Sequence, residues 1–308
     1  MDLYYFPMTY RALTLNGHRT AAGAENAALL GNSVRVNSFD FSRLQQRDQR
    51  ESFHLISGGD LGDATAAFRF ISVGGVITAT TGAKLTDRIS LVQQTFHVEQ
   101  AQVNNPLTAG VVPFTFTDVT EVSTGRGTAY VDPVSGATTG EYVVERFYAR
   151  PAGFPIITGR RSGGDSVLFS VELVCGDPRR YIDTPEAVVL NSGNGYSASC
   201  PNWNSNQGIA LEPLLTIVMA GNGATNLTID SSNDGQAALV LNMSAAGAGT
   251  FTVDCYTGII KKSTTYRADL RTSGVLSFPR IMGGGSTVTV TNTTNVTSVT
   301  VGYRQARG

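Results

Sequence analysis

Apolar and hydroxyl side chains alternate through most of the last third of the chain. Residues 286–291 and 299–303 are clear examples, and glycine-containing turns separate such stretches. Because successive side chains of a β-strand point to opposite faces of its sheet, this alternation places one face in a core and the other in water. The strands expected on this basis are 214–219, 226–229, 237–243, 250–255, 275–278, 286–291 and 296–304. The pattern predicts a β-sandwich or jelly roll at the C-terminus.

Strand patterns also dominate the first half of the chain. Apolar residues occupy every second position from Val167 to Cys175, which predicts a half-buried strand. The β-branched stretch 67–78 contains Gly74 and Gly75, and glycine permits the positive φ that a tight reversal needs. We therefore expect a bent hairpin at these two glycines.

Three more stretches, 111–122, 128–132 and 141–150, show the same alternation. A proline, a serine and a glycine within residues 132–136 are typical of a turn between the last two of them. The sequence therefore predicts a long hairpin that projects from the body of the first domain.

A single stretch has convincing helical spacing, because its apolar side chains recur at intervals of four, three and four residues. These side chains are Leu85, Ile89, Val92 and Phe96. They lie on one stripe, which we expect to pack against a sheet, whereas Asp87, Arg88 and Gln94 face outward.

A change of composition suggests where the chain divides. Serine, glycine and asparagine dominate residues 191–207, as in many interdomain loops. A chain of 308 residues suits about two domains. The expected organisation is a first domain over 1–190, a linker loop over 191–212 and a C-terminal sandwich over 213–308.

Composition and charge exclude several classes of partner. Charged residues make up 15% of the chain, below the roughly 25% of ordinary soluble proteins, and threonine, serine and asparagine fill the water-facing strand positions. Such a surface favours extensive contacts with other chains. The net charge is −1 without a run of like charges, so binding to a nucleic-acid backbone is not expected. The sequence shows neither a signal-peptide pattern nor an apolar run of membrane-spanning length, which predicts a soluble protein made in the cytoplasm.

The sequence offers no cluster of residues suited to catalysis. The histidines are His18, His54 and His97, and they are widely spaced along the chain. Without a second metal-ligand type at motif spacing, they predict neither a metal site nor a catalytic base. We therefore expect no catalytic residues, no metal and no cofactor, and a hydrolase is the weakest of the functional hypotheses. The aspartates 230, 234 and 254 are expected to be turn or strand-end residues.

The three cysteines, Cys175, Cys200 and Cys255, are widely separated and form no CxxC pair. An odd and sparse set argues against a disulfide framework. Cys175 and Cys255 are in phase with apolar neighbours, which predicts that they are buried as small hydrophobic side chains.

Two aromatic residues of the 191–207 segment are the candidate binding residues. Tyr196 and Trp203 on a loop beside a jelly roll could stack on a sugar ring, which gives a carbohydrate-binding module for host attachment as the alternative function. The other interpretation is structural: the chain's one tryptophan covers the seam between domains or a contact between subunits.

The order of elements resembles that of the distal tail proteins, the Dit family, of long-tailed bacteriophages. The resemblance rests on residues 13–17 (Leu-Thr-Leu-Asn-Gly), 84–91 (Lys-Leu-Thr-Asp-Arg-Ile-Ser-Leu), 177–181 (Asp-Pro-Arg-Arg-Tyr), 251–258 (Phe-Thr-Val-Asp-Cys-Tyr-Thr-Gly) and 278–279 (Phe-Pro) followed by 286–290 (Ser-Thr-Val-Thr-Val). These motifs span most of the chain. The long insertion at 111–150 and the long loop at 191–207 depart from the family's pattern.

The resemblance implies a mainly β fold, in which a β-sandwich-like belt domain with one α-helix and a long hairpin precedes a galectin-like sandwich. It also implies a non-enzymatic virion protein that forms a homo-hexameric ring at the tail tip, between the tail tube protein and the hub protein. The outer domains would offer docking positions for adsorption proteins. Such a ring needs two different complementary patches on each subunit, and the sequence identifies neither.

Overall fold

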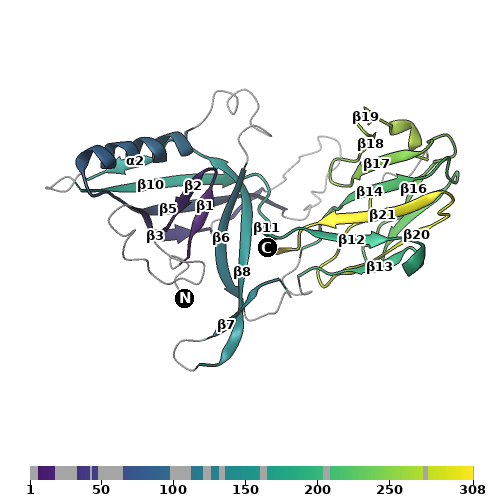
Figure 1. Cartoon of the computed structure of the whole chain (residues 1–308), viewed down its shortest axis with the longest axis horizontal. Coiled ribbons are helices and arrows are strands. Elements are labelled where there is room, and N and C mark those ends of the chain that lie inside the picture. The colour runs from purple at the N-terminus through teal and green to yellow at the C-terminus, as the bar shows by residue number, and fades with distance from the viewer. Residues whose placement is uncertain are drawn as a thin grey trace, which may run out of the picture. The chain divides into compact units, whose positions relative to one another are not determined.

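The structure is a computed structural model, which describes residues 6–17, 33–41, 44–47, 65–97, 112–120, 126–131, 136–159, 165–203, 209–272 and 277–307. The described residues form mainly β-structure, as the sequence predicts (Figure 1). They divide into two compact units, Met1–Pro178 and Arg179–Gly308, each with its own hydrophobic core. Each unit is described by itself below.

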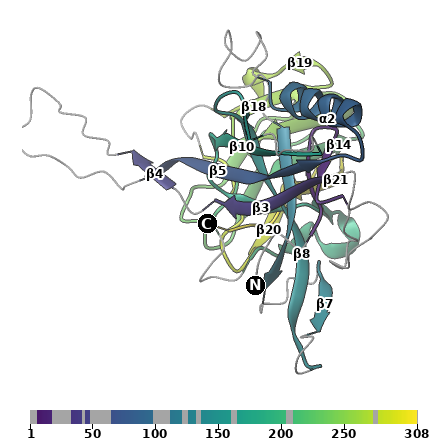
Figure 2. The same ribbon diagram turned by 90° about the vertical axis from the view of Figure 1, so that its left-hand side faces the viewer.

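The first unit is built on antiparallel strands. They are β1 (Met8–Tyr10), β2 (Leu13–Leu15), β3 (Val34–Asp40), β4 (Leu44–Arg47), β5 (Thr65–Thr78), β6 (Val112–Thr120), β7 (Thr128–Val131), β8 (Thr138–Pro151), β9 (Ile156–Thr158) and β10 (Ser166–Cys175). Their main order is β2-β1-β6-β8-β10-β5-β3, while β4 pairs with β5, β7 with β8 and β9 with β10. Figure 2 shows β3 and β5 side by side beneath α2.

The alternation on β10 is confirmed in detail. Val167, Phe169, Val171, Leu173 and Cys175 are buried, and the intervening side chains are exposed or half-buried. The buried side chains contribute to one core with aromatic residues from β1, β3, β6 and β8. The period-2 pattern is therefore the signature of a strand with one face on the core and the other outside.

The strand path of the first unit is closed by a side chain. The backbone N–H of Asn16 donates to Val34 O at 2.8 Å, and Asn16 Oδ1 accepts from the N–H of Val36 at 2.7 Å. Its Nδ2 donates to Phe6 O at 3.2 Å. Since Asn16 follows β2 and Val34 begins β3, this buried residue links the two ends of the path.

The prediction of a hairpin at Gly74 and Gly75 is wrong. Residues 65–78 form the single continuous strand β5, and β3 bulges at the position opposite the glycines, between Val36 and Ser38. A Cβ added to Gly75 would lie 1.9 Å from Arg35 O, so a side chain there would collide with the neighbouring backbone. The glycines serve a close approach of two strands at a bulge, which is an alternative meaning of glycine in a strand pattern.

The predicted helix is α2 (Gly82–Thr95), the only α-helix of the described residues. Thr81 caps its N-terminus, since its side chain accepts from the N–H of Lys84. Leu85, Val92 and Phe96 are buried, and Ile89 packs against the same core while partly buried. The stripe therefore packs against the sheet as expected, while Asp87 and Gln94 are exposed and Arg88 is half-buried.

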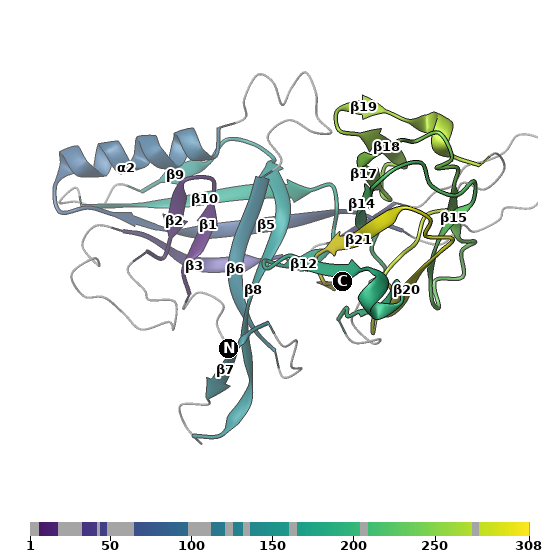
Figure 3. The same cartoon turned by 45° about the vertical axis from the view of Figure 1, so that its right-hand side comes forward.

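The second unit is a β-sandwich. Its strands are β11 (Arg180–Ile182), β12 (Glu186–Leu190), β13 (Ser197–Cys200), β14 (Leu214–Met219), β15 (Leu227–Ser231), β16 (Leu239–Leu241), β17 (Gly249–Asp254), β18 (Ile259–Lys262), β19 (Thr265–Tyr266), β20 (Ser286–Thr291), β21 (Val296–Tyr303) and β22 (Ala306–Arg307). One sheet has the order β12-β21-β14-β17-β18-β19 and the other β13-β20-β15-β16. Both contribute to one core, and Figure 3 shows the first of these sheets along β21 and β14.

The start of this unit differs from the expected boundary. The structure divides the chain after Pro178. The sequence predicts instead a first domain over 1–190 and a linker over 191–212. β12 pairs with β21 over its whole length, and β13 pairs with β20, so both strands belong to the sandwich. The serine-rich composition of β13 is typical of a loop, although these residues form a strand that pairs with β20. Of the expected strand 275–278, residues 275 and 276 lie outside the described residues, and residues 277 and 278 are not in a strand.

Candidate assembly surfaces

Exposed large apolar side chains mark the candidate functional surfaces, because soluble monomers seldom leave them clustered without a role. In the first unit they are Phe68, Leu91, Val131, Val144, Phe154, Ile156 and Leu168. In the second unit they are Val189, Leu214, Tyr256 and Tyr266. Two of these side chains belong to features that we call the arm and the groove. The arm carries Val131, and the groove carries Phe154.

The arm comprises residues 126–131 and 136–140, where β7 pairs with the start of β8. β7 pairs first with Tyr142 and Glu141 of β8, where β6 still pairs with β8 as well. Beyond Glu141, β7 pairs with β8 through Gly140 and Thr138, and the described pairings of β6 with β8 have ended. Figures 1 and 2 show this ribbon extending away from the other strands of the unit. It is the hairpin that the sequence predicts. Val131 is 50% exposed, and Arg126 is the one charged residue of the arm.

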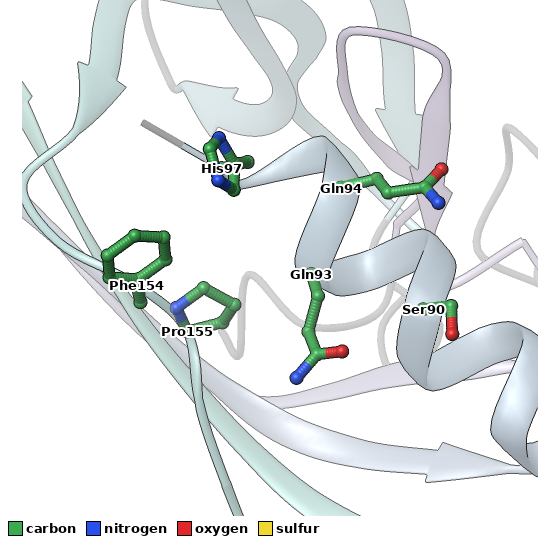
Figure 4. A pocket seen from close by; sticks show the side chains of 6 residues that line it. All are labelled: Ser90, Gln93, Gln94, His97, Phe154 and Pro155. Carbon is green, nitrogen blue, oxygen red and sulfur yellow. The ribbon is translucent and has the colours of Figure 1, made fainter. Parts of the chain in front are cut away.

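The groove lies between α2 and the corner that joins β8 to β9, and its volume is about 590 Å³. Its lining residues are Ser90, Gln93, Gln94, His97, Phe154 and Pro155 (Figure 4). The rings of His97 and Phe154 meet edge to face, with centroids 5.3 Å apart. None of the six lining side chains carries a carboxylate, an ammonium or a guanidinium group.

The strand β9 directly follows the lining residues Phe154 and Pro155 of the groove. Ile157 packs against the core, whereas Ile156 is 64% exposed on the opposite face. Leu168 of β10 lies directly across from Thr158 and is exposed on that same face. Within the described ranges β9 pairs with β10 alone, so its other edge presents backbone groups that could bond to a further strand.

The two predicted aromatic residues, Tyr196 and Trp203, differ in their burial. Trp203 is 2% exposed, and the Arg307 guanidinium lies 4.4 Å from its ring centre. Asn202 fixes this position by accepting hydrogen bonds from the N–H groups of Trp203 and Ala306. Tyr196 is half-buried, and its hydroxyl donates to Val296 O at 2.5 Å. Burial therefore leaves little of the Trp203 ring for a ligand, whereas part of the Tyr196 side chain is accessible.

Two other aromatic residues of this unit, Tyr256 and Tyr266, are exposed, and the sequence pattern does not predict their exposure. Tyr256 lies in the turn between β17 and β18, and Tyr266 lies on the edge strand β19, with exposed fractions of 70% and 66%. The ammonium of Lys261 lies 4.9 Å from the centre of the Tyr266 ring. Their exposure depends on the sheet order, which local sequence patterns do not reveal.

The remaining candidates take the structural roles expected of them. Asp254 Oδ1 accepts from the N–H of Tyr256, and Asp234 Oδ1 accepts from the N–H of Gln236, as turn residues do. His97 lies at the groove, and His18 and His54 fall outside the described residues. In the part of the chain that the structure describes, no three histidine, cysteine or acidic side chains are grouped to hold a metal ion. The same part contains no helix long and apolar enough to cross a bilayer.

All three cysteines are free thiols and are buried, as predicted for Cys175 and Cys255. Burial raises the pKa of Cys175 to about 12, although the nearby Arg69 guanidinium acts in the opposite direction. Burial, with a smaller effect of the Glu186 carboxylate, raises the pKa of Cys200 to about 11. Burial also raises the pKa of Cys255. These thiols are inert packing groups, because the thiolate is the reactive form.

We expect the native protein to leave its three thiols unmodified by Ellman's reagent at pH 8, and to react fully once unfolded in guanidinium chloride. Unfolded thiols ionise near pH 8.5, below the pKa values of the folded protein. The free energy of unfolding should therefore fall as the pH rises from about 8.5 toward 12. Cys175→Ala should remove part of this slope in urea titrations, and an unchanged slope would contradict the raised pKa of Cys175.

Comparison with solved structures identifies one informative likeness. The chain matches phage SPP1 Dit (gp 19.1), described as a paradigm of the hub adsorption apparatus in phages that infect Gram-positive bacteria, with a TM-score of 0.57 and 13% identity. The match covers 98% of each chain. Two structures of the phage P2 baseplate in its activated conformation, one with Ca and one with Sr, give TM-scores of 0.38 and 0.36, each at 10% identity. They cover 87% of this chain and 89% and 90% of theirs.

No protein-family model and no curated protein sequence matches the chain. The informative likeness is therefore structural, and it extends over both units rather than over one common sandwich. The chain shares the fold of SPP1 Dit, so the resemblance to Dit proteins that the sequence indicates is confirmed as a likeness of fold.

Proposed function

We propose that the protein is a structural component of a bacteriophage tail tip. The observation that carries this proposal is the likeness to SPP1 Dit over 98% of both chains. A fold by itself supports many functions, but a match that includes two successive β units in one order is more specific than a match to a single sandwich.

In this proposal six copies form a ring at the distal end of the tail, joining the tail tube protein to the hub protein. The second unit offers docking positions for adsorption proteins. The low content of charged residues and the exposed apolar side chains of the first unit support permanent contacts between copies. Obligate interfaces of this kind often bury about 2,000 Å² or more.

The proposed role is geometric rather than chemical. It needs no catalytic residue, cofactor or metal, and no sequence-specific contact with nucleic acid. The protein would be made in the host cytoplasm and would reside in the virion. The carbohydrate-binding alternative rests on Tyr196 and Trp203, and the 2% exposure of Trp203 disfavours stacking of its ring on a sugar.

Mass photometry of the purified protein, together with electron microscopy of virions, tests the proposal. We expect a particle of six times the 32.6 kDa of one chain, and a six-fold ring at the tail tip in which an antibody to the protein labels the density. A protein that stays monomeric at micromolar concentration and is missing from virions would overturn the assignment.

A further inference from the structure

We propose that the arm of one copy docks in the groove of the next copy, so that arm and groove are the two complementary patches of a head-to-tail interface. The inference rests on the proposed ring and names the surfaces that build it. Its occupant is a second copy of this chain.

The arm and the groove lie at opposite ends of the strand β8. The arm includes the start of β8 at Thr138, and the groove includes Phe154, which follows the end of β8 at Pro151. A strand of 14 residues at about 3.3 Å per residue extends over roughly 45 Å, and somewhat less when it is curved. Because an extended strand cannot fold back on itself, the arm cannot reach its own groove. A contact between them must join two molecules.

The arm exposes several of its side chains in the single chain. The side chains of Thr128, Ala129 and Val131 are exposed. Thr138 and Thr139 on the other strand of the ribbon are exposed as well. A two-stranded ribbon with so little burial is only marginally stable in water. Docking against another surface would bury these side chains and order the ribbon.

The lining of the groove suits an uncharged, extended segment. The side-chain amides of Gln93 and Gln94 provide donors and acceptors for the backbone of an extended strand, and Phe154 with Pro155 provides an apolar wall. The free edge of β9 can add a strand by backbone hydrogen bonds. An acidic or basic segment would leave a charge in this groove without a partner, which is costly. The arm strand Thr128–Val131 is uncharged, extended and partly apolar, so it fits.

Since arm and groove differ, the contact is heterologous, and repeating it gives a ring when the rotation closes. The interface can therefore be tested by blocking one patch at a time. Val131→Asp places a carboxylate on the arm, and Phe154→Asp places one at the groove. Both positions are at least half exposed in the single chain, so each variant should fold.

We expect each variant alone to be monomeric under conditions in which the wild-type chain forms rings. An equimolar mixture should give dimers that contain one chain of each variant, and nothing larger. The Val131→Asp chain still has a working groove and the Phe154→Asp chain still has a working arm, so one intact junction remains. Native mass spectrometry with one isotope-labelled variant identifies this dimer, whose formation also shows that both variants fold.

The matched control is Val189→Asp, which adds the same charge at a 45% exposed valine of the second unit and should leave ring assembly unchanged. Rings from either single variant, or a mixture that yields no dimer, would overturn the arm–groove contact while leaving the ring proposal intact. A wild-type chain that never assembles would overturn the ring proposal, and this contact with it.

Discussion

Replacing Gly75 with alanine is expected to destabilise the first unit by on the order of 3 to 5 kcal/mol. The added Cβ would lie 1.9 Å from Arg35 O and 2.9 Å from the Phe169 ring, and the first of these is backbone that cannot rotate away. β3 would have to move off β5, which would break the pairing on both sides of the bulge. Urea unfolding combined with hydrogen exchange of the β3 and β5 amides measures the loss in this unit separately from the other.

Gly153→Ala is the matched control for this substitution. Gly153 lies in the corner after β8, and among the described residues no atom other than those of its chain neighbours lies within 4 Å of the position of an added Cβ. Its change in stability should stay within about 0.5 kcal/mol, the usual range for surface substitutions. Equal effects of the two alanine variants would show that β3 and β5 do not approach each other as closely as the structure has them.

Removal of the Asn16 side chain should have the second largest effect. Asn16→Ala leaves the N–H of Val36 and the carbonyl of Phe6 without this partner in a buried region, which costs about 1–3 kcal/mol for each group. Asn16 also has a φ of 55°, a left-handed conformation that asparagine tolerates better than alanine because its short polar side chain can hydrogen-bond locally. We expect a total loss of about 4 kcal/mol in the stability of the first unit. Hydrogen exchange of the β2 and β3 amides should report faster opening.

The glycine variant separates the two contributions. Asn16→Gly removes the same amide group but adopts positive φ without steric strain, so it should recover about 1 kcal/mol relative to Asn16→Ala. A wild-type-like Asn16→Ala protein would show that the ends of the strand path are held by other contacts. If both variants lost the same stability, the hydrogen bonds alone would account for the role of Asn16.

These two positions illustrate what sequence patterns miss. Gly75 is in phase with the buried positions Val73 and Ile77, but the neighbour that excludes a side chain there is Arg35, which is distant along the chain. Asn16 lies in the segment 13–17 that carries the resemblance to Dit proteins, yet its bonds to Phe6, Val34 and Val36 depend on the meeting of two strands. A local pattern does not encode which strand becomes the neighbour.

The sequence by itself determined the mainly β fold, the strand over Val167–Cys175, the buried stripe of the helix and the burial of Cys175 and Cys255. Each follows from periodicity or residue type within a short window, because one buried face needs apolar side chains at every second or every third to fourth position. Only the tertiary structure decided that Trp203 is enclosed beside Arg307, that Ser197–Cys200 is a strand, and that arm and groove lie at the two ends of β8. Those features arise from contacts between residues far apart in the chain. Periodicity predicts which side chains are buried, but it does not predict which residues pack against them.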